Sequence, residues 1–155
     1  MITGLLILHS LLGVALLGAI THQAFGALTR RPEARKTSFM ARFRTTEAAG
    51  YRDAIVGLYA AVSVVGAILY PNYRTVVRPI LQSLDLRAAN GAFEIKEHLS
   101  AIGLVMLPAY WVCWKQPLTP EFAGARVLLT WVLAVMVWWN FVVGEVLVAM
   151  KGLFQ

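Results

Sequence analysis

The residues of this sequence that could do chemistry gather in one short stretch, FEIKEHLSAIG, from Phe93 to Gly103. Glu94, Glu97 and His98 stand directly before an apolar run. Carboxylates and imidazoles are side chains that bind metal ions and carry protons. The same charges could instead form a water-facing cap, since negative residues are favourable near a helix N-terminus. The elements that position these residues decide between the two interpretations.

The composition predicts a membrane protein. Of the 155 residues, 59% are hydrophobic and only 14% are charged, and the mean hydropathy is +0.66. Soluble domains rarely combine so little charge with so much apolar content. The single cysteine, Cys113, excludes an internal disulfide and a multi-cysteine metal cluster. No P-loop, Ser-His-Asp arrangement or nucleotide-binding glycine string is present, so we expect no catalytic residues. Enzymatic activity would arise only as the electron-transfer subunit of a membrane oxidoreductase.

Four apolar stretches have about the length that a bilayer requires. They cover about residues 2–28, 54–70, 93–114 and 127–150. Between the second and third, Val76, Ile80 and Leu84 recur every four residues, which predicts a short amphipathic helix on the outer surface or a lid over the helices. The expected fold is all-α: a polytopic membrane protein built as one antiparallel four-helix transmembrane bundle over residues 1–155, with this short outer interfacial helix between spans 2 and 3.

The basic residues predict the orientation, because loops rich in Lys and Arg stay in the cytoplasm. Nine of the fourteen Lys and Arg residues fall on the side of the first loop. We therefore expect residues 29–53 to be cytoplasmic and both termini to lie outside, in a bacterial-type inner (plasma) membrane. Residues Thr37–Ala49 could lie on the inner surface as a basic amphipathic stretch or form a solvated loop. Nucleic-acid binding is not expected, since no recognition motif accompanies the charge.

This orientation brings five ionisable residues to the same depth in the outer leaflet: His9, Glu94, Glu97, His98 and Glu145. A polar group in hydrocarbon needs a partner or a path to water, so each is a candidate site residue. Glu94 and His98 are four residues apart and share a helix face, whereas Lys96 is expected to point away. Asn140, in the middle of the fourth span, is expected to bond to a neighbouring helix.

One interpretation of this convergence is a b-type haem. Two histidines from different helices can ligate one iron, and apolar helices supply its surroundings. His9 and His98 are the expected pair, with Gly13 leaving space for the macrocycle and Trp138 packing on it. His22 is the other candidate on the first span, although 13 residues of separation put it on nearly the opposite face from His9. The function would be electron transfer near the outer leaflet, within a larger complex and with quinone as a candidate partner.

Two alternatives remain open. The first is a metal ion such as Zn, Fe or Mn, bound or transported by a mixed set of ligands: His9, His98, Glu94, Glu97 and Glu145. The second is a structural role without any cofactor. The protein would then be an accessory or assembly subunit, held in the lipid bilayer by helix contacts with other membrane subunits or with copies of itself.

Overall fold

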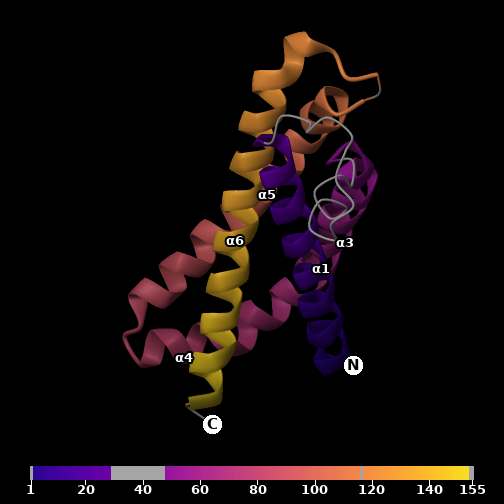
Figure 1. The fold of residues 1–155 in the computed structure, drawn as a ribbon. Coiled ribbons are helices and arrows are strands. Elements are labelled where there is room, and N and C mark those ends of the chain that lie inside the picture. Colours follow the sequence, from indigo (N-terminus) through magenta and orange to yellow (C-terminus); the bar gives the residue numbers. More distant parts are fainter. Residues whose placement is uncertain (1, 29–47, 116, 154–155) are drawn as a thin grey trace, which may run out of the picture.

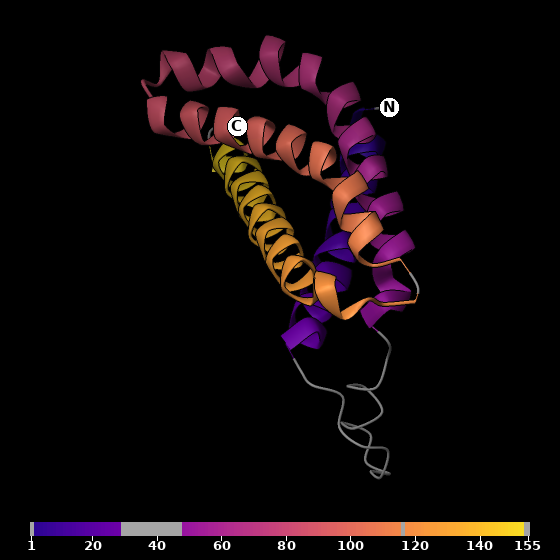
Figure 2. The same ribbon diagram turned by 90° about the horizontal axis from the view of Figure 1, so that it is seen from above.

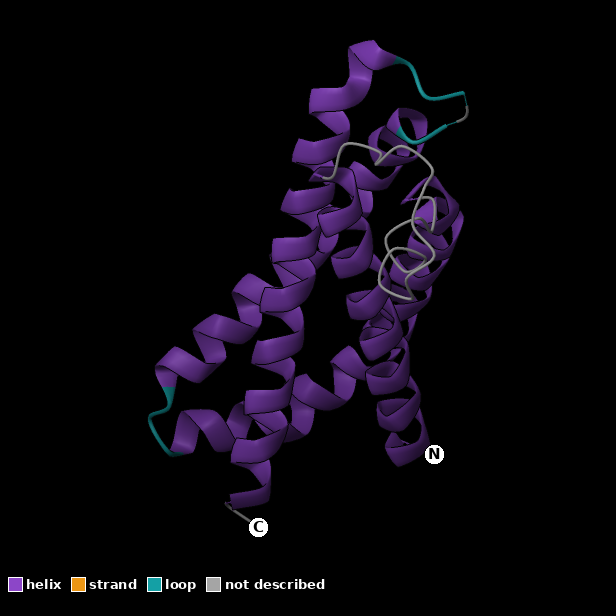
Figure 3. Cartoon of the chain, in the orientation of Figure 1, coloured by secondary structure: helices purple, strands orange, loops and turns teal. Residues whose placement is uncertain are grey.

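Helices make up nearly all of the described chain. The computed structural model describes residues 2–28, 48–115 and 117–153, and no strand occurs in these ranges (Figure 3). The four long helices are α1 (Ile2–Leu28), α3 (Arg52–Asn72), α5 (Arg87–Cys113) and α6 (Ala123–Leu153). The shorter elements are η1 (Ala48–Tyr51), η2 (Tyr73–Val77), α4 (Arg78–Ser83) and η3 (Pro120–Phe122). The all-α class is confirmed for these residues, whereas nearly all of the predicted stretch Thr37–Ala49 lies outside the described residues.

Three helical stretches are long and apolar enough to cross a membrane, in agreement with the class that the composition predicts. They are Ile2–Leu28, Ala49–Ser83 and Pro120–Met150. α5 is not among them, because Glu94, Lys96 and Glu97 lower the hydropathy of its first half. By length and composition, the described helices therefore support three of the four predicted spans.

The second predicted span does not end at Tyr70. α3 continues through Pro71 into η2, a π-helical turn, and then into α4 without a break. Pro71 has no N–H to donate, which interrupts the regular helical ladder just before the π turn. Thr75 Oγ1 donates a hydrogen bond to the Pro71 carbonyl oxygen at 3.0 Å. A short helix, α4, thus lies between the second and third predicted spans, but it is continuous with the second span and forms the end of one long helical stretch.

A sharp turn at Asp85 reverses the chain from α4 to α5. Asp85 has a φ of 52°, a left-handed conformation that Asp adopts more readily than most residues. α5 then starts at Arg87, six residues before the predicted Phe93. As a result, α4 and the first half of α5 form a helical hairpin whose tip points away from α1 (Figure 2).

The core lies at the end of the molecule where α1 finishes and α6 begins (Figure 1). α1 packs against both α3 and α6, and α5 packs against α6. The buried residues of this core are Leu16, Ile20, Ala24, Ile55, Tyr59, Leu107, Tyr110, Trp114, Leu133, Ala134 and Val137. The first and last residues of the described chain lie at the opposite end, apart from each other, where the helices spread (Figure 1). Glu94, Glu97 and His98 of α5 belong to this more open end, whereas Trp138 of α6 contacts Thr21 of α1 beside the core.

Candidate functional site

His9 packs against α3. Its side chain is half-buried, and a Cβ atom added at Gly66 of α3 would lie 3.2 Å from the His9 Cε1 atom. The His9 imidazole therefore fits against α3 because Gly66 has no side chain. The His9 Nδ1 atom is buried and has no hydrogen-bond partner among the described residues. Gly13 serves a different contact, because a Cβ atom there would meet Phe141 of α6 at 3.9 Å.

His98 faces away from the other helices. Its side chain is exposed, and its Nδ1 atom lies 2.7 Å from the carbonyl oxygen of Glu94, one helical turn earlier. Val105, on the same side of α5, is 80% exposed. The structure therefore does not bring His9 and His98 together: His9 contacts α3, whereas His98 lies on the outward side of α5.

Lys96 points inward, so the prediction that it turns away is wrong. Its side chain is only 15% exposed, and its Cε atom would lie 3.8 Å from a Cβ atom added at Gly144 of α6. Its Nζ atom pairs with Glu97 Oε1 at 3.7 Å. The cause is the rotation of α5, whose packed face recurs at spacings of four and three residues. This packed face consists of Lys96, Ser100, Gly103, Leu107 and Tyr110.

Glu94 links the two helices of the hairpin. It pairs with Arg78 of α4 at 3.5 Å and accepts a hydrogen bond from Asn90 Nδ2 at 3.1 Å. Its side chain is 52% exposed. These contacts are not the N-terminal cap considered from the sequence, because α5 begins at Arg87 and has no acidic residue in its first turn.

Glu145 stands apart from the other predicted ligands. Its side chain is exposed on α6 and makes no hydrogen bond or ion pair with any residue that the structure describes. Within the described ranges, no group of three or more His, Cys, Asp or Glu side chains could hold a metal ion. The structure thus does not assemble the predicted metal-binding set His9, His98, Glu94, Glu97 and Glu145.

His22 and Trp138 each have a contact of their own in the second half of α1. The His22 ring packs against Tyr51, with 4.9 Å between ring centroids. Trp138 Nε1 of α6 donates to Thr21 Oγ1 at 3.0 Å. Both residues therefore take part in helix contacts, and no contact joins either of them to His98.

Hydrogen bonds between buried side chains tie the helices together. Asn140 Nδ2 of α6 donates to Ser100 Oγ of α5 at 3.0 Å, which confirms the contact predicted for Asn140. The Tyr110 hydroxyl donates to Gln23 Oε1, and Gln23 is completely buried. Water cannot replace such partners in an apolar environment, so each pair fixes the approach of two helices. The sequence offered one indication of the second pair: a glutamine within an otherwise apolar helix.

A polar cluster closes the end of the core where α3 begins and α5 ends. The Asp53 carboxylate accepts hydrogen bonds from Arg52 at 2.8 Å and from Trp111 Nε1 at 3.0 Å. The Arg52 guanidinium lies 4.9 Å from the Trp111 ring centroid. An amphipathic indole held between charges is typical of a membrane–water boundary.

Comparison with known proteins gives no match to this chain among protein-family models, curated proteins or solved structures. The function must therefore be inferred from the residues and their geometry. Three buried polar atoms have no hydrogen-bond partner among the described residues: His9 Nδ1, Trp131 Nε1 and Asn140 Oδ1. The exposed carboxylate of Glu145 also lacks a described partner, and it is the more informative group because its surroundings are open to another molecule.

Proposed function

We propose that the protein is an integral membrane subunit that works inside a larger assembly, in contact with other membrane subunits or with copies of itself. The observation that carries this proposal is Glu145. It belongs to a helix apolar enough to cross a membrane, its side chain is exposed, and no described residue pairs with it.

A carboxylate that faces lipid is costly. Insertion scales place the penalty for a charged residue at the centre of a spanning helix at about 2.5–3.5 kcal/mol, and the penalty is smaller for Glu145, which lies five residues before the end of the predicted span 127–150. The neighbouring side chains on the same face are exposed and mostly apolar, and we call this surface the Glu145 face: Trp138, Val142, Glu145 and Val148. A neighbouring subunit that donates a hydrogen bond or a positive charge to Glu145 would remove the penalty. This face is therefore the subunit contact in our proposal.

The proposal includes a four-span topology in which α5 also crosses the bilayer, as part of an antiparallel bundle. Nine basic residues then lie on the cytoplasmic side and five outside, which supports both termini outside and residues 29–53 in the cytoplasm of a bacterial-type inner membrane. The outward side chains Ile102 and Val105 of α5 are apolar and suit contact with lipid. The polar residues of the packed face then point toward the other helices, as expected for a polar residue within a span.

Native gel electrophoresis of membranes solubilised in a mild detergent tests this role. We expect the wild-type protein in a complex several times heavier than the single 17.1 kDa chain. Glu145→Leu should shift it to a lighter form, whereas Glu121→Leu, which removes an exposed acid outside α6, should leave the complex intact. A wild-type protein that migrates as a single chain would overturn the proposal.

A second candidate is a b-type haem or redox-linked role, and His98 is the observation in its favour. Its Nδ1 atom bonds to a backbone carbonyl, which leaves Nε2 available on the exposed side. Metal-ligating histidines are commonly oriented by such a second hydrogen bond. His9 and His98 do not fit a single haem within one chain, because they face different surroundings. A haem at His98 would thus take its second ligand from a neighbouring subunit and supply electron transfer, with quinone as a candidate partner.

Absorption spectra of the complex purified from native membranes, oxidised and then reduced with dithionite, test this second candidate. A Soret band and a sharp reduced α band should be lost in His98→Ala and retained in His9→Ala. The absence of these bands from the wild-type complex would exclude the haem. Metal analysis of the same sample tests for bound Zn, Fe or Mn.

A further inference from the structure

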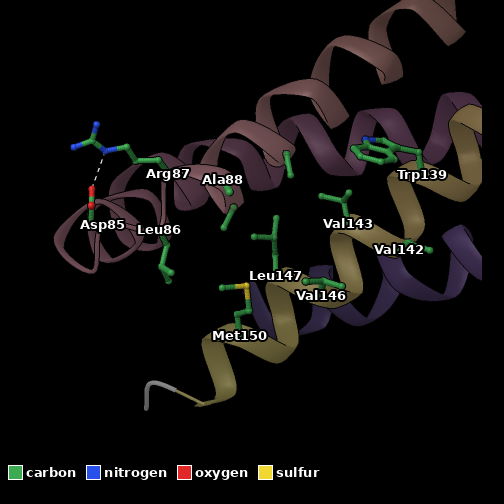
Figure 4. Close-up of a pocket in the computed structure, with 12 residues that line it drawn as sticks. Asp85, Leu86, Arg87, Ala88, Trp139, Val142, Val143, Val146, Leu147 and Met150 are labelled. Atoms are coloured by element: carbon green, nitrogen blue, oxygen red, sulfur yellow. Dashed lines mark hydrogen bonds and ion pairs between the residues drawn. The ribbon is translucent and has the colours of Figure 1, made fainter.

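An apolar groove runs between the start of α5 and the second half of α6, with a volume of about 570 Å³ (Figure 4). Three alanines of α5 form one wall: Ala88, Ala89 and Ala92. Longer side chains of α6 form the other wall: Trp139, Val142, Val143, Val146, Leu147 and Met150. The alanine side chains are too short to fill the space between the two helices. The volume falls within the range of about 300–1,000 Å³ that is usual for small-molecule sites.

One end of the groove carries a single acid and a single base, Asp85 and Arg87 (Figure 4). They form an ion pair, with 2.7 Å between Arg87 Nε and Asp85 Oδ1. Both side chains remain largely exposed, at 77% for Asp85 and 89% for Arg87. The pair leaves the terminal guanidinium nitrogens of Arg87 without a hydrogen bond to any described residue. The mouth of the groove therefore has no net charge but can still bind both an anion and a cation.

We propose that this groove is a binding site for a zwitterionic phospholipid, phosphatidylethanolamine in particular. One acyl chain lies along the alanines and against α6. The phosphate accepts hydrogen bonds from the free guanidinium nitrogens of Arg87, a geometry that suits arginine. The ammonium group of the headgroup donates to the Asp85 carboxylate. An anionic lipid such as phosphatidylglycerol brings no cation, so the single guanidinium of Arg87 would have to balance both its phosphate and the Asp85 carboxylate.

Lipid retention tests the proposal. The full-length protein, purified in a mild detergent, is incubated with an equimolar mixture of phosphatidylethanolamine and phosphatidylglycerol of the same acyl chains, and the bound lipids are counted by native mass spectrometry. We expect phosphatidylethanolamine to be retained about two- to fivefold over phosphatidylglycerol, the factor expected of a solvent-exposed ion pair. Equal retention of the two lipids, or none of either, would overturn the proposal.

Variants separate the groove from its mouth. Ala92→Trp should fill the groove and abolish retention, whereas Ala101→Trp, at an exposed position of α5 outside the groove, should not. Asp85→Asn, at a solvent-exposed turn, should abolish the preference for phosphatidylethanolamine, and Arg87→Gln should weaken the retention of both lipids. Undiminished retention in Ala92→Trp would show that lipid binds elsewhere. If Ala92→Trp does not fold, Asp85→Asn alone tests the proposal. Loss of the preference for phosphatidylethanolamine in this variant supports the proposal, and an unchanged preference contradicts it.

Discussion

The Tyr59 side chain of α3 fills the space in which a side chain at Gly103 of α5 would stand. Tyr59 is 3% exposed, and its hydroxyl donates to the Ser100 carbonyl oxygen at 3.3 Å. A Cβ atom at position 103 would overlap the hydroxyl oxygen and approach the ring carbon that bears it. This contact sets how closely α3 and α5 approach in the middle of the packed face.

Replacing Gly103 by alanine should therefore destabilise the protein. The added methyl group forces either the tyrosine ring or the helix to move, and overpacking of this kind costs about 1–3 kcal/mol. Thermal unfolding in detergent, followed by circular dichroism, measures the loss. Gly57→Ala is the matched control, because a Cβ atom at this exposed position of α3 would meet nothing within 4 Å. The control should be as stable as the wild type or slightly more so. Equal stability of Gly103→Ala and Gly57→Ala would contradict the contact.

Tyr110→Phe should also destabilise the protein, by about 1 kcal/mol, since it removes the hydroxyl that donates a hydrogen bond to the buried Gln23. Unfolding in increasing sodium dodecyl sulfate provides the comparison. Tyr70→Phe is the control, because the Tyr70 ring stacks on Phe93 but its hydroxyl makes no hydrogen bond to a described residue. A Tyr110→Phe variant as stable as Tyr70→Phe would show that the hydroxyl contributes nothing.

The sequence predicted the long helices and the membrane class because both follow from the length and composition of apolar runs. It also placed Asn140 correctly, since a lone amide within a span must find a neighbour. The prediction of which side chains of α5 face the other helices was wrong. Polar residues at 94, 96, 97 and 98 point in nearly every direction around the helix, so no single polar face could be chosen from them. The small residues Ser100 and Gly103 marked the packed face, and Lys96 lies one turn before Ser100 on that face.

The hairpin of α4 and α5 could not be predicted for a different reason. Pro71 and the Asn72 that follows it are typical of a helix end, yet α3 continues beyond both as a π turn. The true reversal occurs at Asp85, a residue without the conformational freedom of glycine. Contacts of Glu94 with Arg78 and of Asn90 with Tyr73 hold this hairpin together, and they form only once both of its arms are in place. The paired charges near the start of α5 are therefore a consequence of tertiary packing.

The inward position of Lys96 predicts a marked difference in reactivity between two lysines. Amine-reactive labelling of the folded protein should modify Lys115, which is exposed, much faster than Lys96, which lies between α5 and α6. Denaturation in sodium dodecyl sulfate should make the two rates similar. Mass spectrometry of the digested protein gives both rates. Equal labelling of Lys96 and Lys115 in the folded state would contradict the inward position of Lys96.

Removing one member of the Lys96–Glu97 pair should have unequal effects. Lys96→Met keeps the long stem and removes the charge from a largely buried position, so we expect stability to stay the same or rise. Glu97→Gln should lower it by about 1 kcal/mol, because Lys96 then keeps its charge without its carboxylate partner. Thermal unfolding measures the stability of the two variants. A Lys96→Met variant that is less stable than Glu97→Gln would contradict the prediction.

The central claim is that the Glu145 face of α6 contacts another subunit, and site-specific photo-crosslinking in native membranes tests it most directly. A benzophenone amino acid is placed at Val148 on this face, outside the lipid groove, and, for comparison, at Val14 of α1, which is exposed to a similar degree at 54% against 61%. We predict a protein adduct from position 148 upon irradiation, which Glu145→Leu removes, and none from position 14. Adducts to lipid alone from position 148 would contradict the claim.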